Sequence, residues 1–147
     1  MEKIIDLFNL KENFKFLDIG CAKGFLMYDI LGINHKIDVF GLDISDYAKK
    51  NAMNEVKDKI LIGNCKNLPF ENNFFDCVVS INTVHNLELD ECKDAIREIQ
   101  RVSNGRAFIQ VDAYRDDGEL DLFKEWMLTA KTYLKPGQWK KLLTYSI

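Results

Sequence analysis

The sequence predicts an α/β domain with a doubly wound, mostly parallel sheet and helices on both faces. Short apolar runs suited to strands alternate with segments whose apolar residues recur at three- and four-residue steps, the spacing of a helix face. Each strand segment is a continuous apolar run, as expected when both faces of a parallel sheet are covered. The 147 residues contain no repeat or flexible linker, so we expect a single domain over residues 1–147.

The strands are expected at regular places in the first part of the chain. Their ranges are Lys15–Ile19, Ile37–Leu42, Lys59–Ile62, Phe75–Ile81 and Arg106–Val111. Right-handed crossovers and a change in strand order would then place any ligand at the carboxyl ends of these strands.

Helices are expected between the strands. A short amphipathic helix should end near Leu10, and another should start after Gly24. Ser45 is a suitable N-cap for a helix that reaches Val56. The clearest helical pattern covers Leu89–Val102, with apolar residues along one face.

The tail has a weaker pattern. Apolar residues over Leu122–Ala130 suit one helix, and Pro136 suits the first turn of another. We expect a short final strand within Leu142–Ile147, with Leu143–Ile147 pairing antiparallel to the fifth strand. The alternatives are a second subunit of a homodimer that covers this exposed edge, and a monomer whose tail is unpaired.

Composition and charge narrow the class of protein. Apolar residues make up 47% and charged residues 29%, as in ordinary globular domains, and the net charge of −3 does not favour nucleic-acid binding. The four cysteines have no zinc-type spacing, so no metal site is expected. The polar N-terminus is unlike a signal peptide, and no apolar run is long enough to cross a membrane. We therefore expect a soluble, cytoplasmic protein.

The first expected strand runs into a glycine-containing turn, LDIGCAKG. An acid at the strand end is followed by glycines, where a ligand can approach the backbone, and then by a helix N-terminus with unpaired N–H groups. Such a turn can hold a carboxylate, a phosphate or a ribose. The dinucleotide pattern G-x-G-x-x-G, started at Gly20, would need glycine at Ala22 and Phe25. A nicotinamide-dependent oxidoreductase is therefore the weaker interpretation.

These residues resemble the motifs of class I S-adenosylmethionine-dependent methyltransferases. LDIGCAKG is similar to their first motif, an acid followed by G-x-G-x-G, with Ala22 where the middle glycine is usual. LIGNCKNLPFENNFFDCVVS resembles their G-D-A-x-x-L-P-F…F-D-x-V stretch, with Asn64 in place of the acid. The matches cover roughly residues 15–112. The resemblance implies a Rossmann-like methyltransferase fold whose C-terminal hairpin is shortened or missing, because only WKKLLTYSI follows the last proline turn.

The resemblance also implies an S-adenosylmethionine site. The loop under the methionine and ribose would comprise Asp18, Gly20, Cys21, Ala22 and Gly24. Asp18 could alternatively be a structural acid that caps the turn.

Residues at the ends of later strands would complete this site. Asp43 would accept both ribose hydroxyls, and Ile44 would pack on adenine. The Asn64 oxygen would accept from the adenine amine, and the Cys65 N–H would reach a ring nitrogen. The backbone near Asn82 would contact the methionine end of the cofactor.

His85 lies in the loop that borders the acceptor pocket of the resembled family. Histidine titrates where a general base is useful, so His85 is the candidate catalytic residue, and a hydrogen-bonded loop residue is the alternative. The loop contains neither N-P-P-Y nor D-P-P-Y, and no Pro-Cys pair suits cytosine chemistry. By elimination we expect O- or N-methylation of a small molecule. A non-catalytic module that binds S-adenosylmethionine or a partner is the alternative function.

Overall fold

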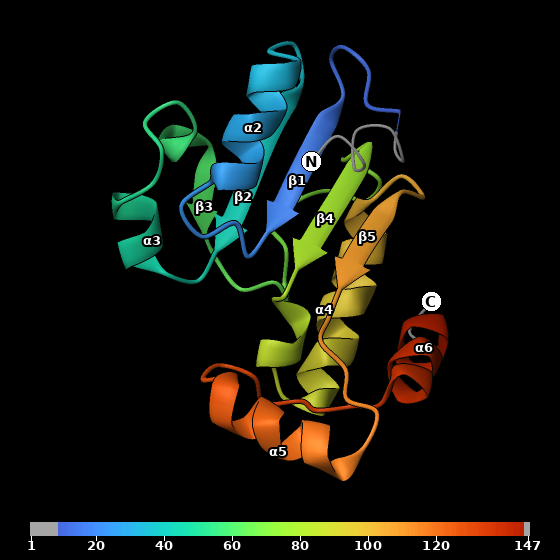
Figure 1. The fold of residues 1–147 in the computed structure, drawn as a ribbon. Coiled ribbons are helices and arrows are strands. Elements are labelled where there is room, and N and C mark those ends of the chain that lie inside the picture. The colour runs from blue at the N-terminus through green and yellow to red at the C-terminus, as the bar shows by residue number, and fades with distance from the viewer. Residues whose placement is uncertain (1–8, 146–147) are drawn as a thin grey trace.

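The computed structural model describes residues 9–145, which form one parallel sheet with helices on both faces (Figure 1). The strands are β1 (Lys15–Ile19), β2 (Asp38–Asp43), β3 (Ile60–Ile62), β4 (Cys77–Ile81) and β5 (Ala107–Gln110). Their order is β3-β2-β1-β4-β5, and all neighbouring strands are parallel. The chain therefore changes direction across the sheet between β1 and β4, and the crevice at that point is where such sheets bind ligands. The doubly wound fold predicted from the sequence is confirmed.

Helices connect these strands and extend into the tail. They are α2 (Phe25–Ile33), α3 (Asp46–Lys50), α4 (Leu89–Val102), α5 (Asp117–Trp126) and α6 (Pro136–Tyr145), with 3₁₀ turns η1 (Lys57–Lys59) and η2 (Val84–Asn86). The short helix expected before Leu10 falls on residues 1–8, outside the described residues. None of the helices in the described part of the chain is long and apolar enough to cross a membrane.

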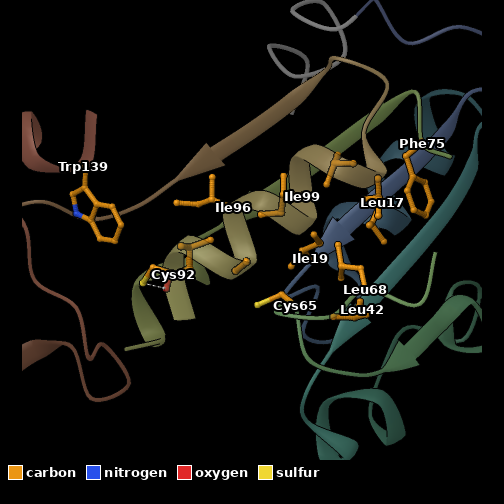
Figure 2. Packing of buried hydrophobic residues seen from close by; sticks show 14 residues of the cluster. Leu17, Ile19, Leu42, Cys65, Leu68, Phe75, Cys92, Ile96, Ile99 and Trp139 are labelled. Carbon is orange, nitrogen blue, oxygen red and sulfur yellow. Dashed lines mark hydrogen bonds between the residues drawn. The ribbon is translucent and has the colours of Figure 1, made fainter. Parts of the chain in front are cut away.

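Apolar side chains cover both faces of the sheet. On β1, Leu17 and Ile19 point into the core beneath α4, while Phe16 points into the core beneath α2. All three side chains are fully buried. Figure 2 shows the α4-side cluster, in which Ile96 and Ile99 face the strands. The burial of both faces explains why the strands are largely apolar in the sequence.

The helix expected from Ser45 to Val56 is shorter than the sequence indicated. Ser45 is the N-cap, because its hydroxyl accepts a hydrogen bond from the Ala48 N–H, but α3 ends at Lys50. Val56 is fully buried without being helical. The Met53 N–H instead donates to the Lys23 carbonyl, which ties this segment to the turn after β1. The spacing of the apolar residues reflected burial against the α2-side core and not a continuous helix.

The expected C-terminal strand is wrong for the described residues. The tail forms α6, which begins at Pro136 as predicted but continues as a helix to Tyr145. Trp139, Leu142 and Leu143 pack on the α4-side core, and this three- and four-residue spacing is helical. Within residues 9–145, β5 pairs with β4 alone, so a second subunit at the β5 edge stays a prediction.

The helix expected over Leu122–Ala130 is displaced toward the N-terminus. Asp116 caps α5 by accepting from the Glu119 N–H, and the helix ends at Trp126. Residues 127–135, called the strap below, have no regular secondary structure and connect α5 to α6. In Figure 1, α5 and the strap lie across the end of the sheet to which the strands point.

Candidate binding site at the carboxyl ends of the strands

A pocket of about 430 Å³ opens where β1, β2 and β4 end. Its size is within the roughly 300–1,000 Å³ that is usual for small-molecule sites. Among the residues expected from the sequence, it is lined by Gly20, Asp43, Ile44, Asn64, Cys65 and Asn82. The sheet therefore brings together side chains from four separate loops at its switch point.

The loop after β1 passes very close to the loop after β4. A Cβ atom built on Gly20 would lie 1.9 Å from the Thr83 hydroxyl oxygen, and Gly20 has a φ of +75°. The Thr83 hydroxyl donates to the Ile19 carbonyl at 3.2 Å, which joins the two loops. Only glycine fits at this position.

Ala22 occupies the place of the usual middle glycine with a φ of +47°. A left-handed conformation costs an L-residue about 1–2 kcal/mol. The turn thus keeps a glycine-like backbone despite the substitution, at the expense of local strain.

Asp43 is held by two backbone groups. Its Oδ2 accepts from the Ala22 N–H at 2.8 Å, and its Oδ1 accepts from the Ser45 N–H at 2.8 Å. These bonds fix the carboxylate between the turn after β1 and the N-terminus of α3. Each carboxylate oxygen retains a further lone pair, so Asp43 can still accept from a ligand hydroxyl in the pocket.

Four of the expected cofactor residues do not line the pocket: Asp18, Cys21, Ala22 and Gly24. Cys21 is buried in the α2-side core. Gly24 has a φ of +78° at the N-cap of α2, and an added Cβ would lie 2.6 Å from a Val56 methyl. These residues shape the turn on which the pocket rests.

Asp18 is buried on the α2 side of β1, with only 4% of its surface exposed. Burial raises the pKa of its carboxyl to about 7, and the negative charge of Asp43 adds to this rise. The Asp18 carboxyl is therefore only partly ionised at neutral pH, and Asp43 is the one of these two acids that lines the pocket.

The remaining part of the pocket combines polar and apolar groups. Ile44 is 73% exposed and forms an apolar shelf at the pocket wall. The Asn64 amide oxygen accepts from the Lys66 N–H at 3.0 Å, which shapes the loop after β3 and leaves the oxygen one further lone pair. Burial raises the pKa of the Cys65 thiol to about 11, so it is neutral at physiological pH and a poor nucleophile.

The structure does not bring His85 into this pocket. The side chain is 2% exposed on η2, and its Nδ1 accepts from the Asp112 N–H at 3.2 Å. Burial lowers the pKa of His85, and the charge of Asp112 partly opposes this effect. The Nε2 atom faces the Asp112 carboxylate at 4.0 Å and has no hydrogen-bond partner among the described residues.

Several pocket residues were not found from the sequence. Lys66 and Glu91 form an ion pair at the wall, and Lys66 lowers the pKa of Glu91. Glu91 also completes a capping box at the start of α4 by accepting from the Glu88 N–H, but Glu88 stands where the usual sequence pattern has Ser or Thr. Lys131 reaches the pocket from the strap, and no sequence motif indicates this long-range contact.

Residues 17–109 match a family model described as a methyltransferase domain. Curated relatives include 24-methylenesterol C-methyltransferase 3 of Arabidopsis thaliana, 30% identical over 80% of this chain and 36% of that protein. Another is a tRNA (carboxymethyluridine(34)-5-O)-methyltransferase of Saccharomyces cerevisiae, 30% identical over 82% of this chain and 46% of that protein. The chain thus spans less than half the length of these two relatives.

Solved structures share the fold over nearly the whole chain. The YcgJ protein of Bacillus subtilis has a TM-score of 0.78 at 18% identity, covering 99% of this chain and 66% of the other. A complex of the Haloferax volcanii Trm112 methyltransferase activator with a putative methyltransferase gives a TM-score of 0.80 at 20% identity, with coverages of 99% and 66%. The fold is therefore the Rossmann-like fold of class I methyltransferases. The chain belongs to the S-adenosylmethionine-dependent methyltransferase family.

S-adenosylmethionine is the methyl donor implied by this family, and the pocket fits it chemically. A carboxylate suits ribose hydroxyls, an exposed aliphatic side chain suits a purine face, and amide groups suit its polar edge. Asp43, Ile44 and Asn64 provide these groups side by side.

Proposed function

We propose that this chain binds S-adenosylmethionine in the 430 Å³ pocket and transfers its methyl group to an oxygen or nitrogen of a small molecule. The observation that supports this most strongly is the convergence of Gly20, Asp43, Ile44 and Asn64 at the switch point of the sheet. In this proposal Asp43 accepts from the ribose hydroxyls and Ile44 packs on adenine. Asn64 and the Cys65 N–H bind the adenine edge.

The methionine part would lie over Gly20 and the loop after β4. Asn82 has a φ of +53° at the end of β4, a conformation that asparagine adopts more readily than most residues. Its N–H donates to the Gln110 carbonyl at 3.0 Å, so the loop is anchored to β5. The pocket wall is therefore preformed on two strands. The Asp43 carboxylate adds negative potential at the pocket wall, which favours a positively charged ligand.

The donor brings a methyl group already activated on a sulfonium centre. The residues of the chain therefore need only orient donor and acceptor and exclude water, and orientation alone can contribute about 7–11 kcal/mol. A group that takes a proton is required only for acceptors that must lose one.

A second cavity supports a small, largely apolar acceptor. A groove of about 750 Å³ lies between α5 and the segment after β5, at the same end of the sheet as the pocket. Leu122, Phe123, Trp126 and Met127 make most of its wall apolar. Its charged residues are Asp112 and the ion-paired Arg115 and Glu119, so among the described residues of this wall no basic side chain is left without an acidic partner. Such a wall suits a small organic molecule better than a phosphate backbone, which basic residues would bind.

The decisive test is product formation. The protein should be incubated with S-adenosylmethionine and separate pools of small hydroxylated metabolites, amines and bulk tRNA, with S-adenosylhomocysteine release as the readout. The proposal expects release with one of the two small-molecule pools. Release with tRNA alone would assign a nucleic-acid acceptor, and cofactor binding without any release would support a non-catalytic module. Binding of NADH in place of S-adenosylmethionine would refute the proposal.

A further inference from the structure

The strap is hydrogen-bonded to η2, the turn that follows β4. The N–H groups of Lys131 and Thr132 both donate to the His85 carbonyl at 3.0 Å. The Thr132 hydroxyl donates to the Leu87 carbonyl at 2.7 Å, and the Thr129 hydroxyl lies 3.0 Å from the Asn86 amide oxygen. All the strap residues in these bonds lie beyond residues 17–109, which match the family model. The strap therefore lies outside the range that matches the family model but is hydrogen-bonded to residues within it.

The His85 side chain makes a second connection between the same parts. Its Nδ1 accepts from the Asp112 N–H, and the Asp112 carbonyl accepts from the Trp139 indole N–H at 3.0 Å. A chain of hydrogen bonds thus runs from η2 through Asp112, in the segment after β5, to α6. Because Nδ1 accepts, it carries no proton, and the neutral ring must be protonated at Nε2. His85 therefore acts only as the acceptor, through Nδ1, in its hydrogen bond with the Asp112 N–H.

The turn held in this way forms part of the cofactor pocket. Asn82, Asn86 and Leu87 line it on either side of His85. The Asn86 side-chain amide donates to the Asn82 carbonyl at 3.1 Å, which ties η2 to the residue that follows β4. His85 itself lies behind this wall, in a small cavity with Asp112, Tyr114 and Tyr133.

We propose that His85 is a positioning residue: with the strap, it locks the loop after β4 in the geometry that binds the methionine end of S-adenosylmethionine. This inference rests on the proposed function, since it concerns the same pocket. It differs from a general-base role, because the ring acts through the Asp112 amide and touches neither donor nor acceptor.

The connection should be sensitive to acid. A second proton on His85 would go to Nδ1, which would then be a donor facing the Asp112 N–H. The titratable groups around the ring are the Asp112 carboxylate and the hydroxyls of Tyr114 and Tyr133. Burial lowers the pKa of His85, so this connection is retained at neutral pH and lost only in acid.

The test compares His85→Asn with His85→Leu. The Asn oxygen replaces Nδ1 as an acceptor but does not titrate, whereas Leu leaves the Asp112 N–H without a partner. Calorimetric titration with S-adenosylhomocysteine at pH 7.5 should give nearly wild-type affinity for His85→Asn and affinity about tenfold weaker for His85→Leu. Lowering the pH to 5 should weaken binding more in wild type than in His85→Asn.

Further variants separate positioning from unfolding. Thr132→Val removes the hydrogen bond from the strap to the Leu87 carbonyl and should also weaken binding of S-adenosylhomocysteine. Thr144→Val, on the exposed face of α6, should leave this binding unchanged. Wild-type affinity in His85→Leu, or equal pH profiles for wild type and His85→Asn, would overturn the proposal. So would normal binding with lost turnover in His85→Asn, which would indicate a base.

Hydrogen exchange tests the connection independently of the cofactor. The amides of Asp112, Lys131 and Thr132 should exchange faster in His85→Leu than in His85→Asn. If wild-type protein bound no S-adenosylhomocysteine, the proposed function would fail, and these exchange rates would still support or refute the connection itself.

Discussion

Asp18→Asn tests the electrostatics of the site through protein stability. The folded state raises the pKa of Asp18 from 3.8 to about 7, mainly by burial. Between these values the unfolded chain has lost the proton while the folded protein retains it. The folded state therefore binds more protons, and the free energy of unfolding must fall as pH rises through this window. At roughly 1.4 kcal/mol per pKa unit, the loss attributable to Asp18 is about 4 kcal/mol, complete above pH 7.

The assay is urea denaturation of wild type and Asp18→Asn at several pH values from 4 to 8. Asparagine has nearly the same shape but does not titrate, so the difference in stability between variant and wild type should shift by several kcal/mol in favour of the variant as pH rises. Asp29→Asn, at an exposed position on α2, is the matched control and should show no such shift. Parallel stability profiles for wild type and Asp18→Asn would refute the reasoning.

Three further predictions concern the turn after β1 and the tail. Gly20→Ala should destabilise the protein by more than the approximately 1–2 kcal/mol of its left-handed backbone, because its Cβ would clash with Thr83; an unchanged melting curve would contradict this. Ala22→Gly should raise the free energy of unfolding by about 0.5–1 kcal/mol, because the relief of backbone strain exceeds the added entropy of the unfolded chain. A lower free energy of unfolding in denaturant titration would contradict this. Trp139→Ala should cost about 3–5 kcal/mol because the side chain is 3% exposed, whereas Trp126→Ala, at 82% exposed, should cost little; equal losses would argue against the docking of α6.

The sheet could be predicted from the sequence because its strands are buried on both faces. Runs such as Phe75–Ile81 are nearly all apolar, and no helix face would require this. The helix predictions failed where a residue is buried for a reason other than its place on a helix. Val56 has the spacing of a helical residue but is buried in a loop, because backbone bonds to the turn after β1 replace those of a helix.

In the tail, by contrast, the helical spacing of the apolar residues was the correct indicator and the predicted strand was wrong. Trp139, Leu142 and Leu143 have helical spacing and lie on α6, where an edge strand was predicted for Leu143 and the residues after it. The unpaired edge of β5 favours a strand, but the helix buries Trp139 and packs Leu142 and Leu143 against the α4-side core. Local periodicity was the better guide, because it reports directly which side chains can be buried together.

At the site, strand-end residues were found because parallel strands bring their carboxyl ends together. Asp43 and Asn64 follow directly from this rule. The roles within the turn after β1 could not be separated from sequence, since whether Asp18 faces the pocket depends on which side of β1 it occupies. Lys131 and the contacts of His85 depend on the path of the strap, which no local pattern encodes.

The central claim is that the pocket at the switch point binds S-adenosylmethionine through Asp43. Its most direct test is the dissociation constant of S-adenosylhomocysteine for wild type and Asp43→Ala, measured by calorimetry at one pH on protein shown to be folded. Loss of a charged acceptor should weaken binding by about 1.5–3 kcal/mol, or roughly 10- to 150-fold. Saturable binding by wild type with this loss in the variant is the expected result. Equal affinities, or no heat at millimolar ligand, would contradict the account.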